Sequence, residues 1–265
     1  MLLISMRLLR RILTTAAITL GVIALGAFWV APVALSFEAA RTPKPDARVV
    51  PTDLKDLSVS QVPGTKVSYV GYEFEIPWTD LDQTRTRSVP KDNPYMVGLV
   101  FRSGLHLIVS ASPPRMLPSE FAREWKFSPQ KLELVFGRGA AQSDYSFLEN
   151  LYEFTPDKMH RWGLTPSVHY REQMLLMLKT TVLSGLSADT GIFHIQNQSY
   201  RGFQLGDPQA HPRSIAVQLY SDGGSIELTF AGGDGRGPVA VTQPELNRIV
   251  QSLRKLRQDG SDYTN

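Results

Sequence analysis

The sequence contains no cysteine. This absence excludes disulfides, thiol nucleophiles, CxxC redox motifs, cysteine-ligated zinc, iron–sulfur clusters and a lipid-modified N-terminal cysteine. The stability of the chain must therefore come from a hydrophobic core. With 265 residues, of which 42% are hydrophobic, the chain is long enough to form one.

The sequence also lacks a real excess of charge of one sign. It has 28 Lys and Arg against 25 Asp and Glu, and Arg7, Arg10 and Arg11 account for the whole surplus. The rest of the chain is formally neutral, and no run concentrates Lys and Arg. Nucleic-acid-binding domains carry a basic patch or stripe, so we expect no nucleic-acid partner.

Motifs for catalysis or for cofactor binding are missing as well. Ser128-Pro-Gln-Lys131 matches S-x-x-K, but the triplets that accompany this motif in enzymes are absent, and Ser128 before Pro129 is typical of a helix N-cap. The Gly232–Gly237 loop lacks the lysine and hydroxyl of a phosphate-binding loop. We therefore predict no catalytic residue and no cofactor.

Two pairs of residues are weak candidates for a metal site. Asp157 and His160, and likewise His169 and Glu172, are three residues apart, a spacing that places both side chains on one face of a helix. Together they could supply two carboxylates and two imidazoles. Because they lie in a loop-rich stretch of ordinary polar residues, we predict no metal ligand.

The N-terminal region carries the strongest signal. From Ile12 to Leu35 no residue is charged, and a helix of this length spans about 36 Å, more than the roughly 30 Å of a bilayer core. The three arginines before it determine the topology, because positive charge stays in the cytoplasm. We predict a transmembrane anchor in the lipid bilayer, with Trp29 near its outer interface and the C-terminal domain periplasmic or extracellular.

Cleavage of this segment is an alternative. Ala34-Leu35-Ser36 resembles a signal-peptidase site before Phe37. Secretory hydrophobic regions, however, usually have about 7–15 residues, which favours an uncleaved signal anchor. The predicted organisation is a cytoplasmic N-terminus (1–11), an anchor (12–35), a proline-containing stalk (36–66), an extracytoplasmic domain (67–257) and a polar tail (258–265).

The domain is predicted to be α+β, with an antiparallel sheet of about five to seven strands and packed helices. Alternating apolar and polar residues predict the following strands: 67–70, 72–76, 95–101, 105–111, 191–196, 200–205, 214–220 and 225–230. Helices are expected at 119–125, 128–136, 143–154, 156–162 and 170–184, and from Thr242 onward.

Two helical segments have informative patterns. Thr242-Gln-Pro-Glu245 fits a capping box, and the residues behind it form an apolar stripe: Leu246, Ile249, Val250, Leu253 and Leu256. We expect this helix to pack on the sheet, with a membrane-surface helix as the alternative. The run from Met174 to Leu178 is apolar on every side of a helical turn, which predicts a helix wedged between the sheet and the middle segment of the chain. A partner surface or a groove for an apolar ligand is the alternative.

Two stretches resemble the PsbP/Mog1-type α/β sandwich. One is Val70–Trp78, and the other is the hairpin of Ile215–Phe230 with the helix that ends at Leu253. The resemblance implies helices on an antiparallel sheet and a role as a binding or assembly module. We therefore expect a membrane-tethered module that binds or assists another envelope protein. An exported enzyme whose active site includes His160 and His169, and a carrier of an apolar ligand or lipid, stay open as alternatives.

Overall fold

The structure, a computed structural model, describes these parts of the chain: residues 45–88, 94–159, 166–183, 190–232 and 237–256. The predicted cytoplasmic N-terminus, anchor and polar tail lie outside these residues. Among the helices that are described, none combines the length and the apolar character needed to cross a membrane.

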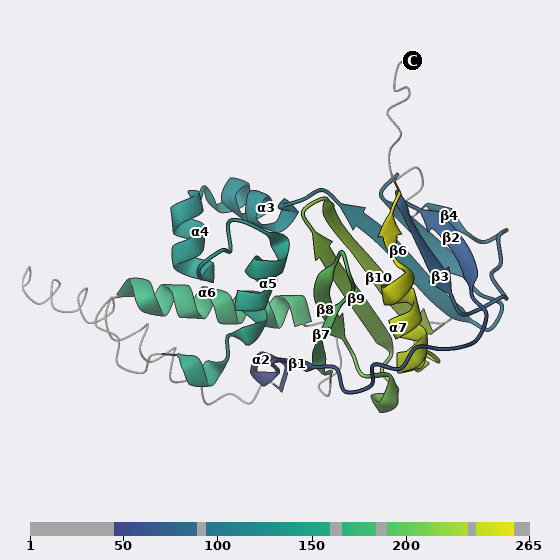
Figure 1. Ribbon diagram of the computed structural model, residues 1–265. Helices are drawn as coiled ribbons and strands as arrows, with labels where there is room; N and C mark the ends of the chain where they lie inside the picture. Colours follow the sequence, from purple (N-terminus) through teal and green to yellow (C-terminus); the bar gives the residue numbers. More distant parts are fainter. Residues whose placement is uncertain (1–44, 89–93, 160–165, 184–189, 233–236, 257–265) are drawn as a thin grey trace, which may run out of the picture.

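An eight-stranded sheet forms the centre of the domain (Figure 1), with the strand order β1-β7-β8-β9-β10-β6-β5-β4. Its strands are β1 (Pro51–Asp53), β4 (Arg87–Ser88), β5 (Met96–Val100), β6 (Leu105–Ser112), β7 (Ile192–Gln196), β8 (Arg201–Leu205), β9 (Ser214–Ser221) and β10 (Gly224–Gly232). All neighbours are antiparallel except β1 and β7, which are parallel. The α+β class is confirmed. The large sheet is mixed and not purely antiparallel, because β1, which comes from the segment predicted to be a stalk, pairs parallel with β7.

A smaller antiparallel sheet packs against one face of the large one. It contains β2 (Thr65–Tyr69), β3 (Tyr72–Ile76) and β11 (Arg254–Lys255), in the order β11-β3-β2. Alternate residues of β3 are buried in a core shared with β5, β6, β9 and β10. The period-two pattern of this segment therefore did identify its buried face. About five to seven strands were expected in one sheet, whereas the described residues form eleven strands in two sheets. All eight strand-like segments of the sequence are present, and the short strands β1, β4 and β11, which have no recognisable pattern, are added to them.

The helices lie in two places (Figure 1). Helices α3 to α6 lie together on one side of the molecule and share a second core with β7, β8 and β9, whereas α7 packs with β3 in the first core. The helices are α2 (Pro45–Arg48), α3 (Met116–Trp125), α4 (Pro129–Phe136), α5 (Asp144–Glu153), α6 (Pro166–Leu183) and α7 (Gln243–Ser252), with single 3-10 turns η1 (Pro156–Lys158) and η2 (Pro208–Ala210). The helix expected over 156–162 is described only as η1.

Both predicted helix caps are present. The hydroxyl of Ser128 accepts a hydrogen bond from the Lys131 N–H at 3.2 Å, and Pro129 occupies the first turn of α4. The carboxylate of Glu245 accepts from the Thr242 N–H at 2.8 Å and completes the capping box of α7. These contacts satisfy backbone donors that a helix N-terminus leaves unpaired, so the capping role of Ser128 is confirmed.

The apolar stripe of the last helix is shorter than predicted. Four of its members are buried in the first core: Leu246, Ile249, Val250 and Leu253. Leu256 is exposed, and its N–H donates to the Gly71 carbonyl at 2.9 Å. The prediction was wrong for Leu256, because α7 ends at Ser252 and the chain continues extended as β11, where helical spacing no longer applies.

The run from Met174 to Leu178 is packed on several sides. Met174 and Leu175 belong to the second core, Leu176 lies in a third cluster with Ala47 and Met159, and Met177 is exposed. Helix α6 contacts α2, α4 and α5. The packing on several sides is confirmed, but the main neighbours of α6 are the helices α2, α4 and α5 and not the sheet.

Candidate functional site

The structure describes the two residue pairs considered as metal ligands only in part. Asp157 lies exposed in η1, and Glu172 is buried in α6. His160 is outside the described residues, and His169 lies in α6. In the part of the chain that the structure describes, no three histidine or carboxylate side chains gather as ligands for a metal ion.

One cavity lies at an open edge of the large sheet. Strand β1 pairs with β7 only as far as Asp53 and His194, and the chain then leaves the sheet, so Ile195 and Gln196 border an opening. The opening has a volume of about 740 Å³, and we call it the edge groove. Its lining residues are Asp53, Leu54, Leu57, Tyr145, His194, Ile195, Gln196, Arg201, Asn247, Val250 and Gln251.

One wall of the edge groove belongs to the strap, which we define as residues 47–62. The domain holds the strap through its backbone. On α7, the Asn247 amide donates to the carbonyls of Asp56 and Ser58 at 2.8 and 2.7 Å, and Arg248 donates to those of Ser60 and Val62 at 2.8 and 2.6 Å. Over these residues, the segment expected to be a stalk is part of the domain surface.

Lys179 holds the start of the strap. Its side chain is fully buried, and Nζ donates to the carbonyls of Val49, Tyr152 and Phe154 at 2.5, 2.7 and 2.7 Å. Burial lowers the pKa of Lys179 to about 8, and the charge of Lys158 contributes to the shift. All three donors of the ammonium group are used, and Lys179 does not line the edge groove. Its position explains a structural role, not a catalytic one.

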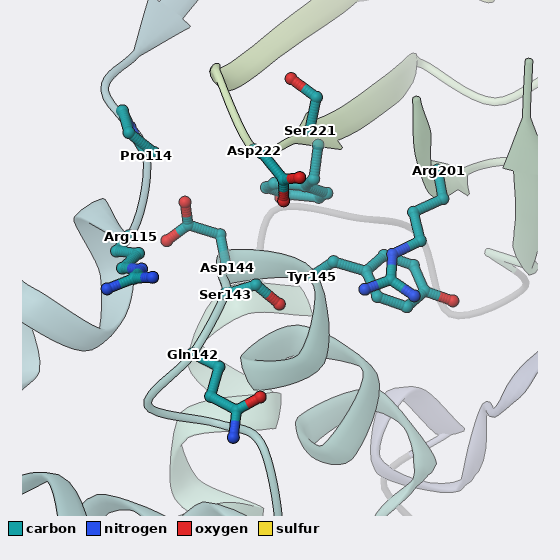
Figure 2. Close-up of a pocket in the computed structure, with 10 residues that line it drawn as sticks. Pro114, Arg115, Gln142, Ser143, Asp144, Tyr145, Arg201, Ser221 and Asp222 are labelled. Carbon is teal, nitrogen blue, oxygen red and sulfur yellow. The ribbon is translucent and has the colours of Figure 1, made fainter. Parts of the chain in front are cut away.

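A second cavity of about 150 Å³ adjoins the groove, and we call it the junction pocket (Figure 2). It lies where the starts of α3 and α5 meet the turn between β9 and β10. Figure 2 shows Arg115 on one side, Asp144 and Asp222 near the centre, and Arg201 over Tyr145 on the other side. Both cavities are lined by Tyr145 and Arg201, so this pair forms the boundary between them.

The position of the Asp144 carboxylate in the junction pocket is explained by its contact with the start of helix α3. Its carboxylate accepts a hydrogen bond from the Leu117 N–H at 2.8 Å. Helix α3 needs this acceptor, because its own N-cap residue, Arg115, is left-handed (φ 58°) and provides no side-chain cap. Burial raises the pKa of Asp144, although backbone hydrogen bonds with Arg115, Met116 and Leu117 oppose the shift.

The boundary pair presents a cation on an aromatic support. The Arg201 guanidinium lies 4.2 Å from the ring centroid of Tyr145, and that ring also stacks on Phe203 with centroids 5.1 Å apart. The Tyr145 hydroxyl donates to Glu149 at 2.8 Å. Burial raises the pKa of Tyr145, and Glu149 adds to the shift. At neutral pH the site therefore offers a neutral phenol beneath an Arg201 side chain that points to both cavities.

The chemistry of the edge groove suits recognition. Covalent catalysis needs a nucleophile within hydrogen-bonding distance of a base. The described residues that line the groove include no serine, threonine or cysteine. Amide, guanidinium and aliphatic side chains dominate instead. The sequence does not indicate this combination, because the strap, α5, the β7–β8 hairpin and α7 are distant from one another in the chain.

No protein-family model matches the sequence, and no curated protein is similar to it. The resemblance to the PsbP/Mog1-type sandwich therefore stays a prediction. Function has to be inferred from the groove and from the position of the strap in the chain.

Proposed function

We propose that the chain is a membrane-anchored, extracytoplasmic binding or assembly-accessory module, and that the edge groove receives another envelope protein. The observation that carries this proposal is which part of the chain forms the wall of the groove. The strap that forms it follows the predicted anchor in the sequence, so a partner bound in the groove would be held beside the membrane.

The lining of the groove supports a protein as the occupant. Leu54, Leu57 and Val250 provide apolar surface next to amide side chains, a mixture that is typical of protein interfaces. Leu57 is 74% exposed, and the strap continues with two further exposed aliphatic side chains, Val59 and Val62. Exposed apolar patches that are surrounded by polar residues often mark interaction sites.

The carrier alternative is supported less. It requires an enclosed apolar cavity beside Met174–Leu178, and neither the edge groove nor the junction pocket is lined by this run. The enzyme alternative would rest on Asp53 and His194, which are partners in the register of β1 and β7 and both line the groove. The described lining of the groove adds no serine, threonine or cysteine to them.

Site-specific crosslinking in cells tests the proposal. A photoreactive amino acid is placed in the full chain at Leu57 or at Gln251, both in the groove, and at Ile108 of β6 as the control. We expect discrete protein adducts from the two groove positions and none from Ile108. The same adduct pattern at all three positions, or no adduct from the groove, would reject the groove as a binding site.

A further inference from the structure

The end of helix α6 exposes a surface without charge. Met177 is 51% exposed, and Val182 is 41% exposed. The only charged residue from Met177 to Val182 is Lys179, whose side chain is fully buried. Helix faces on the surface of a soluble domain usually carry charged residues, so an uncharged exposed turn requires a reason.

The two threonine hydroxyls of this turn are satisfied within the helix. The hydroxyls of Thr180 and Thr181 both donate to the carbonyl of Met177, each at 2.8 Å. Hydroxyls that already have an acceptor lose little when water is removed, whereas an unpaired hydroxyl is costly in an apolar environment. The surface from Met177 to Val182 can therefore contact an apolar medium at low cost.

The position of α2 places this turn near the predicted anchor. Ala47 of α2 is buried against Leu176 of α6, the residue before Met177. Only residues 36–44 separate Leu35, the end of the anchor, from the start of α2. This connection reaches about 35 Å at full extension. The opposite end of the domain, with β4 and β5, lies far from α6 (Figure 1).

We propose that α6 between Met177 and Val182 is the surface with which the domain rests on the lipid bilayer. This inference depends on the anchor in the proposed function. The contact area is small, but the anchor makes the contact intramolecular and so raises its effective concentration. The contact orients the domain, and with it the strap and the edge groove, relative to the membrane.

The absence of native cysteine allows a direct test. Met177→Cys and, as the control, Ile108→Cys on β6 are each labelled with a fluorophore in the full chain. Ile108 is 38% exposed and is also aliphatic. The proteins are reconstituted in phosphatidylcholine vesicles that contain nitroxide-labelled lipid. We expect the probe at position 177 to lose most of its fluorescence, and the probe at position 108 to keep it. Equal quenching at both positions, or none at position 177, overturns the inference.

A second variant and a flotation assay separate the possible failures. Adding Val182→Asp to Met177→Cys should restore the fluorescence and lower the melting temperature only slightly, because Val182 is 41% exposed. Quenching that survives this change would contradict contact through this turn. A chain that fails to float with the vesicles refutes the anchor, and this inference falls with it. A chain that floats but shows no quenching at position 177 refutes only the surface proposed here.

Discussion

Replacing Leu253 with alanine tests how far the last helix contributes to the core. Leu253 follows the final residue of α7, is only 4% exposed, and lies in the first core with residues of β3, β6 and β10. Its carbonyl also accepts a hydrogen bond from the Asn197 amide at 3.4 Å. The substitution removes the apolar side chain and leaves this backbone contact in place.

The magnitude follows from the burial of the side chain. Truncating a buried leucine to alanine costs about 2–5 kcal/mol once the cavity is included, out of a typical domain stability of about 5–15 kcal/mol. For a domain of this size, each kcal/mol lowers the melting temperature by roughly 2–4 °C. Leu253→Ala should therefore lower it by roughly 4–20 °C.

The neighbouring Arg254 provides the matched control. It forms an ion pair with Glu73, but its side chain is exposed, and exposed pairs contribute only about 0.2–1 kcal/mol. Arg254→Ala should lower the melting temperature by less than about 4 °C. Thermal unfolding of the detergent-solubilised chain, followed by near-ultraviolet circular dichroism, measures both variants. If Leu253→Ala melts at the wild-type temperature, the helix is not part of the core, and the membrane-surface alternative is favoured again.

Two further predictions concern the anchor and the buried lysine. A reporter fused after Asn265 should be active only outside the cytoplasm, and replacing Arg7, Arg10 and Arg11 with aspartate should reduce that activity; activity in the cytoplasm would contradict the proposed topology. The pKa of Lys179 falls from 10.5 to about 8 in the folded chain, so the unfolded chain binds more protons between these values and the free energy of unfolding should rise by up to about 3 kcal/mol from pH 8 to 10.5. Lys179→Met should lack this rise in denaturant titrations across that range, and an identical pH dependence in both proteins would show that the lysine does not titrate as described.

Local patterns in the sequence determined most of the large elements. The alternation of Tyr72, Phe74 and Ile76 identified both β3 and its buried face. The N-cap of α4 and the capping box of α7 were readable because the residues that satisfy a helix start lie within three positions of it. Such features are decided by neighbours in the chain, and they can therefore be predicted without knowledge of the fold.

The contacts that build the candidate site depend on the tertiary structure alone. Strand β1 has three residues and begins with Pro51. It is a strand only because it pairs with β7, which lies far along the chain. Nothing near Lys179 in the sequence indicates that three carbonyls from α5 and the strap surround it, and nothing near Arg201 indicates the ring of Tyr145. A single long-range contact has no periodicity, and its free energy arises only when packing brings distant segments together. The sequence therefore predicted the buried faces of β3 and α7 and the helix caps, whereas folding created the strap, the edge groove and the buried lysine.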